Sequence, residues 1–263
     1  MPLSKPFKKV PTFTLFQIRL AHLCAWHLWD GLDFETGKKA ECSDEDLLVK
    51  FAVPFQQTRA IPTRNHITEQ NIRQLIRVGR LKALFRSANP TDFQKGIKTI
   101  KKSTIPIYNS WRFGTLRLTP TGYATKAILE LGMGFVNQTY ASSINGNYRV
   151  PLASRILFFA VPDMLVFNYS NGLGKAMNFQ SRPQAAIPYF NREMHEGLKR
   201  NHALLSKFKM PPPVLLDFEM WKRIKKYRWW QRRVLDIALL LHFNVAYAHP
   251  DLIRLARSGF PKI

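Results

Sequence analysis

The residues best suited to chemistry form a run of cations interleaved with aromatic rings near the C-terminal end. Seven Lys or Arg side chains share the twelve residues 222–233 with Tyr227, Trp229 and Trp230. Cations neutralise phosphates, and aromatic rings stack on unpaired bases. The pattern predicts a nucleic-acid contact made by Lys222, Arg223, Lys225, Lys226, Arg228, Trp229, Arg232 and Arg233. The alternative is that Trp229 and Trp230 close the core while the charges are merely solvated.

A second candidate contact is the segment Asn171-Gly172-Leu173-Gly174-Lys175. It is not the phosphate loop of a nucleotide-hydrolysing enzyme, because Tyr169 stands where that loop has its first glycine and Ala176 follows the lysine. A glycine-containing turn at a helix start can still hold one phosphate on its backbone N–H groups. Gly172, Gly174 and Lys175 are therefore predicted to contact DNA.

The sequence predicts neither a metal nor a cofactor. No two of the seven His residues stand in the His-x-x-x-His spacing that places two ligands on one helix face. Cys24 and Cys42 are too few for a disulfide framework and favour a reducing compartment, so a cytoplasmic protein is expected. The most apolar stretch, 150–167, contains Arg155, Asp163 and two prolines, which argues against a membrane span.

The charge balance points to a polyanionic partner. Forty Lys and Arg face seventeen Asp and Glu, and the resulting net charge of +23 is far more than solubility requires. The hydrophobic share of 46% shows that the charge lies on a folded body rather than on a disordered tail. Nucleic acid, with duplex DNA first, is the expected partner, and no membrane association is predicted. The oligomeric state is left open.

Hydrophobic periodicity predicts a mainly α protein. Gly31 ends the first helix, and Ser43 with the three acids after it starts the second. The predicted helices are 12–31, 43–53, 68–86, 121–131, 151–161, 173–180, 187–208 and 214–245. Residues 87–105 are expected to form a linker or hairpin, and alternating residues favour a small β element near 97–119. The expected division is an N-terminal helical domain, 1–88, and a C-terminal DNA-binding domain, 106–263.

The segment 151–170 resembles part of the helix-hairpin-helix DNA glycosylase superfamily, and is most similar to its bacterial 8-oxoguanine-glycosylase-fold group. The resemblance lies in a helix start with small residues, an apolar helix, Pro162 and an extended apolar run. Arg155 stands where the family has Lys, and Asn168 stands where it has the catalytic Asp. The run 230–239 is similar to that group's C-terminal helix, and the whole resemblance covers about 110–245.

The resemblance implies an all-α fold that bends DNA, flips a base into a pocket and breaks the N-glycosidic bond. Asn168 cannot carry the negative charge of the catalytic acid, and the Arg155 guanidinium is a poor amine nucleophile. Either Asp163 takes over the acid's role in a monofunctional glycosylase, or the chain binds DNA without cleaving the bond. The predicted catalytic set is therefore Asp163, Asn168 and Arg155.

Two other functions fit the same sequence. The predicted helix 68–86 has a basic face and follows two other predicted helices, an arrangement with the outline of a helix-turn-helix. A non-enzymatic DNA binder of a plasmid or mobile element is therefore one alternative. An RNA-binding protein is the other, because the charge excess does not distinguish the two nucleic acids.

Overall fold

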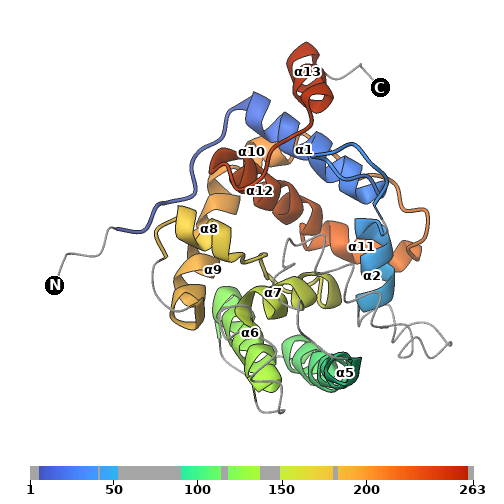
Figure 1. The fold of residues 1–263 in the computed structure, drawn as a ribbon, viewed down its shortest axis with the longest axis vertical. Helices are drawn as coiled ribbons and strands as arrows, with labels where there is room; N and C mark the ends of the chain where they lie inside the picture. The colour runs from blue at the N-terminus through green and yellow to red at the C-terminus, as the bar shows by residue number, and fades with distance from the viewer. Residues whose placement is uncertain are drawn as a thin grey trace.

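The computed structural model describes residues 6–40, 42–52, 90–113, 118–136, 149–179 and 183–259, and these residues form helices almost exclusively (Figure 1). Eleven helices lie in this part of the chain. The only β pairing within it is an isolated bridge between Leu32 and Lys39. The predicted mainly α class is therefore confirmed for the described residues.

The first helices are α1 (Leu15–Trp29), α2 (Asp44–Phe51), α5 (Pro90–Arg112), α6 (Pro120–Val136) and α7 (Arg149–Ala160). The others are α8 (Asn171–Ala176), α9 (Pro183–Arg200), α10 (His202–Leu205), α11 (Phe218–Lys226), α12 (Trp229–His242) and α13 (Pro250–Ser258).

The centre of the fold is α7 together with the extended chain that follows it. Every residue from 150 to 169 except Leu165 is buried. Figure 1 shows α5 and α6 on one side of α7 and α12 with α1 on the other, while α2 and α11 lie near one end and α8 and α9 near the opposite end. The most apolar stretch of the sequence is thus a core helix covered on all sides.

Side-chain caps fix where the first two helices begin. Thr14 and Gln17 form a capping box at α1, and Ser43 and Asp46 form one at α2. Gly31, just beyond α1, has a φ of +75°, a left-handed conformation that glycine adopts without strain. The predicted stop at Gly31 and the predicted start at Ser43 are confirmed, whereas the first helix begins at Leu15 and not at residue 12.

The predicted linker or hairpin at 87–105 and the β element near 97–119 are wrong wherever the structure describes them. Residues 90–112 form the long helix α5. The alternation is also compatible with a helical period, because Thr104, Ile107 and Tyr108 are buried on one face with Trp111 partly buried beside them. Pro90 stands at the first helical position, where a missing N–H costs nothing.

The single helix predicted at 214–245 is two helices. Arg228 has a φ of +57°, in the left-handed region, and separates α11 from α12. The chain therefore changes direction immediately before Trp229. The helices predicted at 173–180 and 187–208 also differ, since α8 ends at Ala176 and the second segment divides into α9 and α10.

The N-terminal helix packs against C-terminal elements: α1 lies along α12 and contacts α13. The predicted helix 68–86, with its helix-turn-helix outline, lies outside the described residues, and the division into two domains stays a prediction. No helix in the described ranges is long and apolar enough to cross a membrane.

A buried histidine joins α1 to α12. Trp230 donates from Nε1 to Nδ1 of His22 at 3.2 Å, and the imidazole stacks on Phe208. His22 is 4% exposed, and burial lowers its pKa from 6.5 to about 4. Protonation would place a second donor opposite the indole N–H, so the fold requires the neutral ring.

Stability should therefore fall as the pH falls from about 6.5 to about 4, because the unfolded chain binds a proton there that the folded chain excludes. We expect His22 to contribute a loss on the order of 3 kcal/mol across this window. Urea unfolding at intervals between pH 8 and pH 4 measures it. His22→Gln keeps an acceptor for Trp230 but does not titrate, so its curve should be flatter; parallel curves would contradict the assignment.

Candidate nucleic-acid interface

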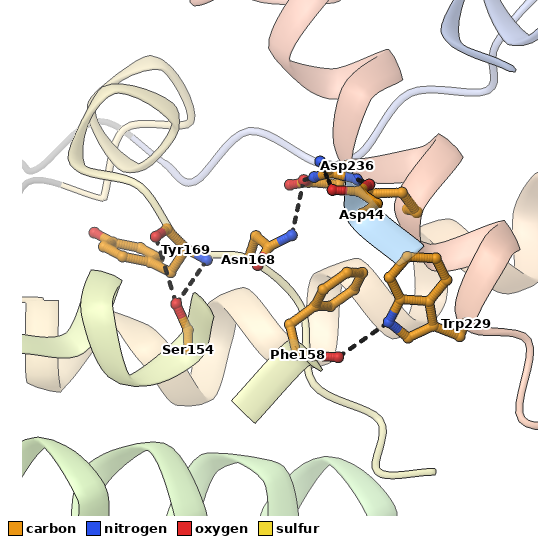
Figure 2. Close-up of polar contacts among 8 residues, drawn as sticks. Asp44, Ser154, Phe158, Asn168, Tyr169, Trp229 and Asp236 are labelled. Carbon is orange, nitrogen blue, oxygen red and sulfur yellow. Dashed lines mark hydrogen bonds and ion pairs between the residues drawn. The ribbon is translucent and has the colours of Figure 1, made fainter. Parts of the chain in front are cut away.

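The three residues with predicted catalytic roles lie inside the fold. Arg155 on α7 is 6% exposed, while Asp163 and Asn168, on the extended chain after α7, are 5% and 2% exposed. Asn168 donates from Nδ2 to Oδ2 of Asp236 at 3.0 Å, as Figure 2 shows. The Asn168 amide is thus a hydrogen-bond partner of Asp236 on α12, at the position where the glycosylases carry a carboxylate.

Asn168 belongs to a buried charge cluster formed by Asp44, Arg155, Arg233 and Asp236. Arg233 binds Asp44 with Nε–Oδ2 and Nη2–Oδ1 distances of 2.6 and 3.0 Å, and its Nη1 lies 3.2 Å from Asp236 Oδ2. Two guanidinium groups and two carboxylates leave this cluster without net charge. The bidentate pair joins the first turn of α2 to α12.

Arg155 completes the cluster electrostatically. Burial lowers its pKa to about 10, with Arg233 acting in the same direction and Asp236 and Asp44 opposing it. Burial also raises the pKa of Asp236, which the two arginines oppose. Arg155 Nη1 and Asn168 Oδ1 have no hydrogen-bond partner among the described residues. The guanidinium stays protonated at neutral pH, so it offers no amine nucleophile.

Asp163 lies in a different network. Its Oδ2 accepts a hydrogen bond from Nη2 of Arg223 on α11, and the same nitrogen donates to the Tyr108 hydroxyl of α5 at 2.9 Å. Burial raises the pKa of Asp163, while Arg223 opposes the shift. The structure therefore does not bring Asp163, Asn168 and Arg155 together into one exposed site. Asp163 belongs to one ion-pair network, and Asn168 and Arg155 belong to another.

The basic run 222–233 divides into an outer part and an inner part. Trp229, Arg232 and Arg233 are at most 2% exposed. Trp229 donates from Nε1 to the Phe158 carbonyl at 3.0 Å (Figure 2), and Arg232 donates to the carbonyls of residues 162, 164 and 166. In the described fold these three side chains hold the core together and do not reach the surface, so they are excluded as phosphate contacts there.

The outer part is α11, which has one exposed face and two borders. Phe218, Lys222, Lys225 and Lys226 are exposed, whereas Met220 and Ile224 are buried on the opposite face. Asp217 caps the helix start by accepting from the backbone N–H groups of residues 219 and 220. Trp221 and Arg223, both partly buried, lie along the two borders of the exposed face.

Each ring on or beside this face has a cation above it. Lys222 Nζ lies 4.4 Å from the Phe218 ring centroid, and Lys225 Nζ lies 4.8 Å from that of Trp221. Lys226 Nζ lies 5.5 Å from the centroid of Tyr227, which is also exposed. We name this set of side chains, together with exposed Arg228, the α11 face.

The two borders of the α11 face differ in charge. Trp221 donates to the carbonyl of Pro211, and Pro211 lines a groove of about 430 Å³ whose charged lining residues are Asp30, Glu45, Asp46 and Lys39. Glu45 fastens the chain at this border, since its Oε1 accepts from the backbone N–H groups of residues 214, 215 and 216 at 2.7, 2.6 and 3.1 Å. This border carries carboxylates.

The other border carries cations. Arg223 donates to the Tyr108 hydroxyl, which also accepts from Nη1 of Arg112 at 3.4 Å. Arg112 ends α5, and its guanidinium lies 5.8 Å from the ring centroid of Phe113, which is 70% exposed. The basic and aromatic surface therefore continues from α11 to the end of α5.

The glycines of the other predicted contact have a packing role. A Cβ at Gly174 would lie 2.3 Å from the Tyr169 hydroxyl oxygen, and one at Gly172 would lie 3.0 Å from a methyl carbon of Val245. Close packing thus requires or favours glycine at both positions. Lys175 is exposed at the end of the six-residue helix α8, and its predicted phosphate contact stays a prediction.

Sequence reasoning did not identify Phe218, Trp221, Arg112 or Phe113 as surface residues of the site. The i, i+3 spacing of Phe218 and Trp221, each followed four residues later by a lysine, was the available signal, because such pairs meet on a helix surface. Nothing in the local sequence marks Arg112 and Phe113, which reach α11 only through Tyr108.

Comparisons of the chain with models of protein families, with curated proteins and with solved structures found no match. Among the described residues, no group of three or more His, Cys, Asp or Glu side chains is placed to hold a metal ion.

The buried cluster predicts a large stability difference between two acid substitutions. Asp44→Ala leaves Arg233 buried without its bidentate partner, and we expect a loss of about 3 to 5 kcal/mol in the free energy of unfolding. Glu219→Ala removes an exposed acid paired with Lys222, and the loss should be below about 1 kcal/mol. Denaturant unfolding at neutral pH measures both, and similar losses would show that the Asp44 pair does not hold α2 to α12.

Proposed function

We propose that the protein binds nucleic acid and that the α11 face is its principal phosphate-binding surface. The observation that carries the proposal is the concentration of exposed cations there: Lys222, Lys225, Lys226 and Arg228 lie on or just after one short helix, against the two exposed acids Asp217 and Glu219 at its start. Each phosphate that such a surface neutralises releases counterions, which favours binding.

The charge of the whole chain supports this proposal. A net charge of +23 produces a field that attracts polyanions from a distance, and the α11 face offers them short-range contacts. Four acids, Asp44, Glu45, Asp163 and Asp236, are at most 5% exposed, and three arginines, Arg155, Arg232 and Arg233, are buried with them, so the interior holds little of the net charge. Binding is therefore expected to be electrostatic and tolerant of sequence.

The geometry favours binding without base excision. In a glycosylase the flipped nucleotide must come close to a catalytic carboxylate, or to a water molecule that the carboxylate activates. Asp163 is paired with Arg223, and Asn168 and Arg155 are buried at the neutral charge cluster. The resemblance to the glycosylases thus corresponds here to residues that stabilise the fold.

Replacing Lys222, Lys225 and Lys226 together with Gln should weaken binding to every sequence by roughly tenfold or more and reduce the slope of log affinity against log salt by about 3. The helix should survive, because these side chains are exposed. Fluorescence anisotropy with labelled DNA and RNA at several salt concentrations provides the measurement.

The matched control replaces three exposed lysines on other helices, Lys98, Lys126 and Lys199, with Gln. This control removes the same amount of charge, but from outside the α11 face, and it should therefore lower affinity only slightly. Equal losses in the two variants would mean that the charge acts as a diffuse field and that the α11 face has no special part. Undiminished binding by the α11 variant would place the interface elsewhere.

Incubation with duplexes that carry oxidised, alkylated or deaminated bases, followed by alkali, should reveal no strand breaks above the level without protein. The reason is the burial of Asn168, Arg155 and Asp163. If base release is seen and Asp163→Asn abolishes it while DNA binding persists, the protein is a glycosylase and Asp163 is its acid.

A further inference from the structure

The α11 face carries exposed aromatic rings as well as charge, and phosphate binding alone does not require them. We infer that this surface binds single-stranded nucleic acid, with bases stacked on Phe218 and Trp221. The inference rests on the proposed function, because it names the form of nucleic acid that the same surface takes. It departs from the duplex DNA that the sequence favours.

The first support is the exposure and alignment of the two rings. Phe218 is 62% exposed, although burying a phenylalanine side chain is worth about 1.5 to 3 kcal/mol. Its ring lies within 17° of parallel to the Trp221 ring, with the centroids 6.2 Å apart. The indole is held by a hydrogen bond from its Nε1 to the Pro211 carbonyl at 3.4 Å. Two nearly parallel rings, one of them anchored, form a platform for planar bases.

The second support is the pairing of each ring with its own cation. Lys222 and Phe218, and Lys225 and Trp221, repeat one aromatic–lysine unit at a spacing of three residues. A single strand presents bases and phosphates in the same alternation, so each unit can take one nucleotide. Lys222 would exchange its exposed pair with Glu219 for a phosphate. In a duplex the bases are stacked on one another and paired, so their faces cannot reach Phe218.

The third support is that charge gives the strand a direction. Asp30, Glu45 and Asp46 outnumber Lys39 in the lining of the groove at the Trp221 border, which disfavours phosphate there. Arg223 and Arg112 lie on the opposite side and are joined through Tyr108, and the exposed ring of Phe113 follows them. A strand on the α11 face is therefore directed toward the end of α5, where another ring and cation pair is available.

An anionic membrane is the other surface that exposed apolar and basic groups attract. Val214 and Leu215, exposed just before α11, would suit it. The lysine amines, however, lie 4.4 to 4.8 Å above the rings of Phe218 and Trp221 instead of extending away from them. A nucleotide that stacks on either ring displaces its amine but supplies a phosphate to pair with it, whereas lipid tails offer the displaced amine no partner, so nucleic acid is the partner we argue for.

The test compares five probes with the full chain by fluorescence anisotropy: single-stranded DNA, single-stranded RNA, a duplex of the same sequence, a single strand of abasic sugar phosphates, and vesicles of phosphatidylserine and phosphatidylcholine in a competition. The abasic strand keeps the charge and removes the stacking surface. We expect the base-containing strands to bind at least roughly tenfold more tightly than the abasic strand, since stacking contributes about 1 to 3 kcal/mol per base. The DNA and RNA arms identify which strand is preferred.

Phe218→Ala should lower affinity for the base-containing strands about fivefold to a hundredfold and leave affinity for the abasic strand unchanged. Phe218→Tyr keeps a ring and should restore binding. Tyr247→Ala removes another exposed aromatic side chain, between α12 and α13, and should have no effect. Circular dichroism checks that each variant is folded.

Four outcomes would overturn the inference. Equal affinity for base-containing and abasic strands would show charge binding without stacking, and tighter binding to the duplex would show that the surface reads a helix; either leaves the proposed function intact. An equal effect of Phe218→Ala on all strands would give Phe218 a purely structural role. Binding to the vesicles with no affinity for any nucleic acid would remove both the inference and the proposed function.

Discussion

The structure depends on the contact between one buried arginine and the chain that leaves its central helix. After α7 ends at Ala160, Pro162 prevents the helix from continuing, and the chain makes a turn at residues 162–164 before it runs on without regular structure. Arg232 donates to the carbonyls of residues 162, 164 and 166 at 2.5, 2.6 and 2.7 Å, respectively. Buried carbonyls need donors, and one planar guanidinium supplies three. Burial lowers the pKa of Arg232 to about 9, a value that is still high enough for the guanidinium to be charged at neutral pH.

This contact explains why the cations of residues 222–233 have opposite fates. Arg232 points into the core, and its neighbours Trp229 and Arg233 follow it to Phe158 and Asp44. The left-handed conformation of Arg228 lets α11 leave at a different angle, so its lysines remain in solvent. Residues 222–233, which the sequence suggests form one basic surface, therefore divide into a buried part on α12 and an exposed part on α11. The buried part fixes the start of α12, against which α11 packs.

The sequence predicts features that depend on neighbouring residues and misses those that depend on distant ones. The cap at Ser43, the stop at Gly31 and the apolar helix around Phe158 follow from local preferences, and the structure confirms them. The buried fates of Arg232 and Arg233 do not, because their partners lie more than sixty residues away in the chain. The helix at 90–112 was mistaken for a strand because short alternating segments fit both periods. For the candidate site, the lysines of α11 were identified from composition, but the exposure of Phe218 was not.

The distribution of acids connects the core to the surface. Asp44 and Asp236 neutralise Arg233 and Arg155 inside the fold, Asp163 orients Arg223, and Glu45 binds the backbone before α11. Each of these carboxylates stabilises a buried donor whose desolvation would otherwise be costly. Because acids and arginines are buried together, the interior holds little net charge, and the excess of cations remains outside. Asp163 also holds Arg223 at the border that leads to α5, so this ion pair shapes the surface on which the proposed strand would lie.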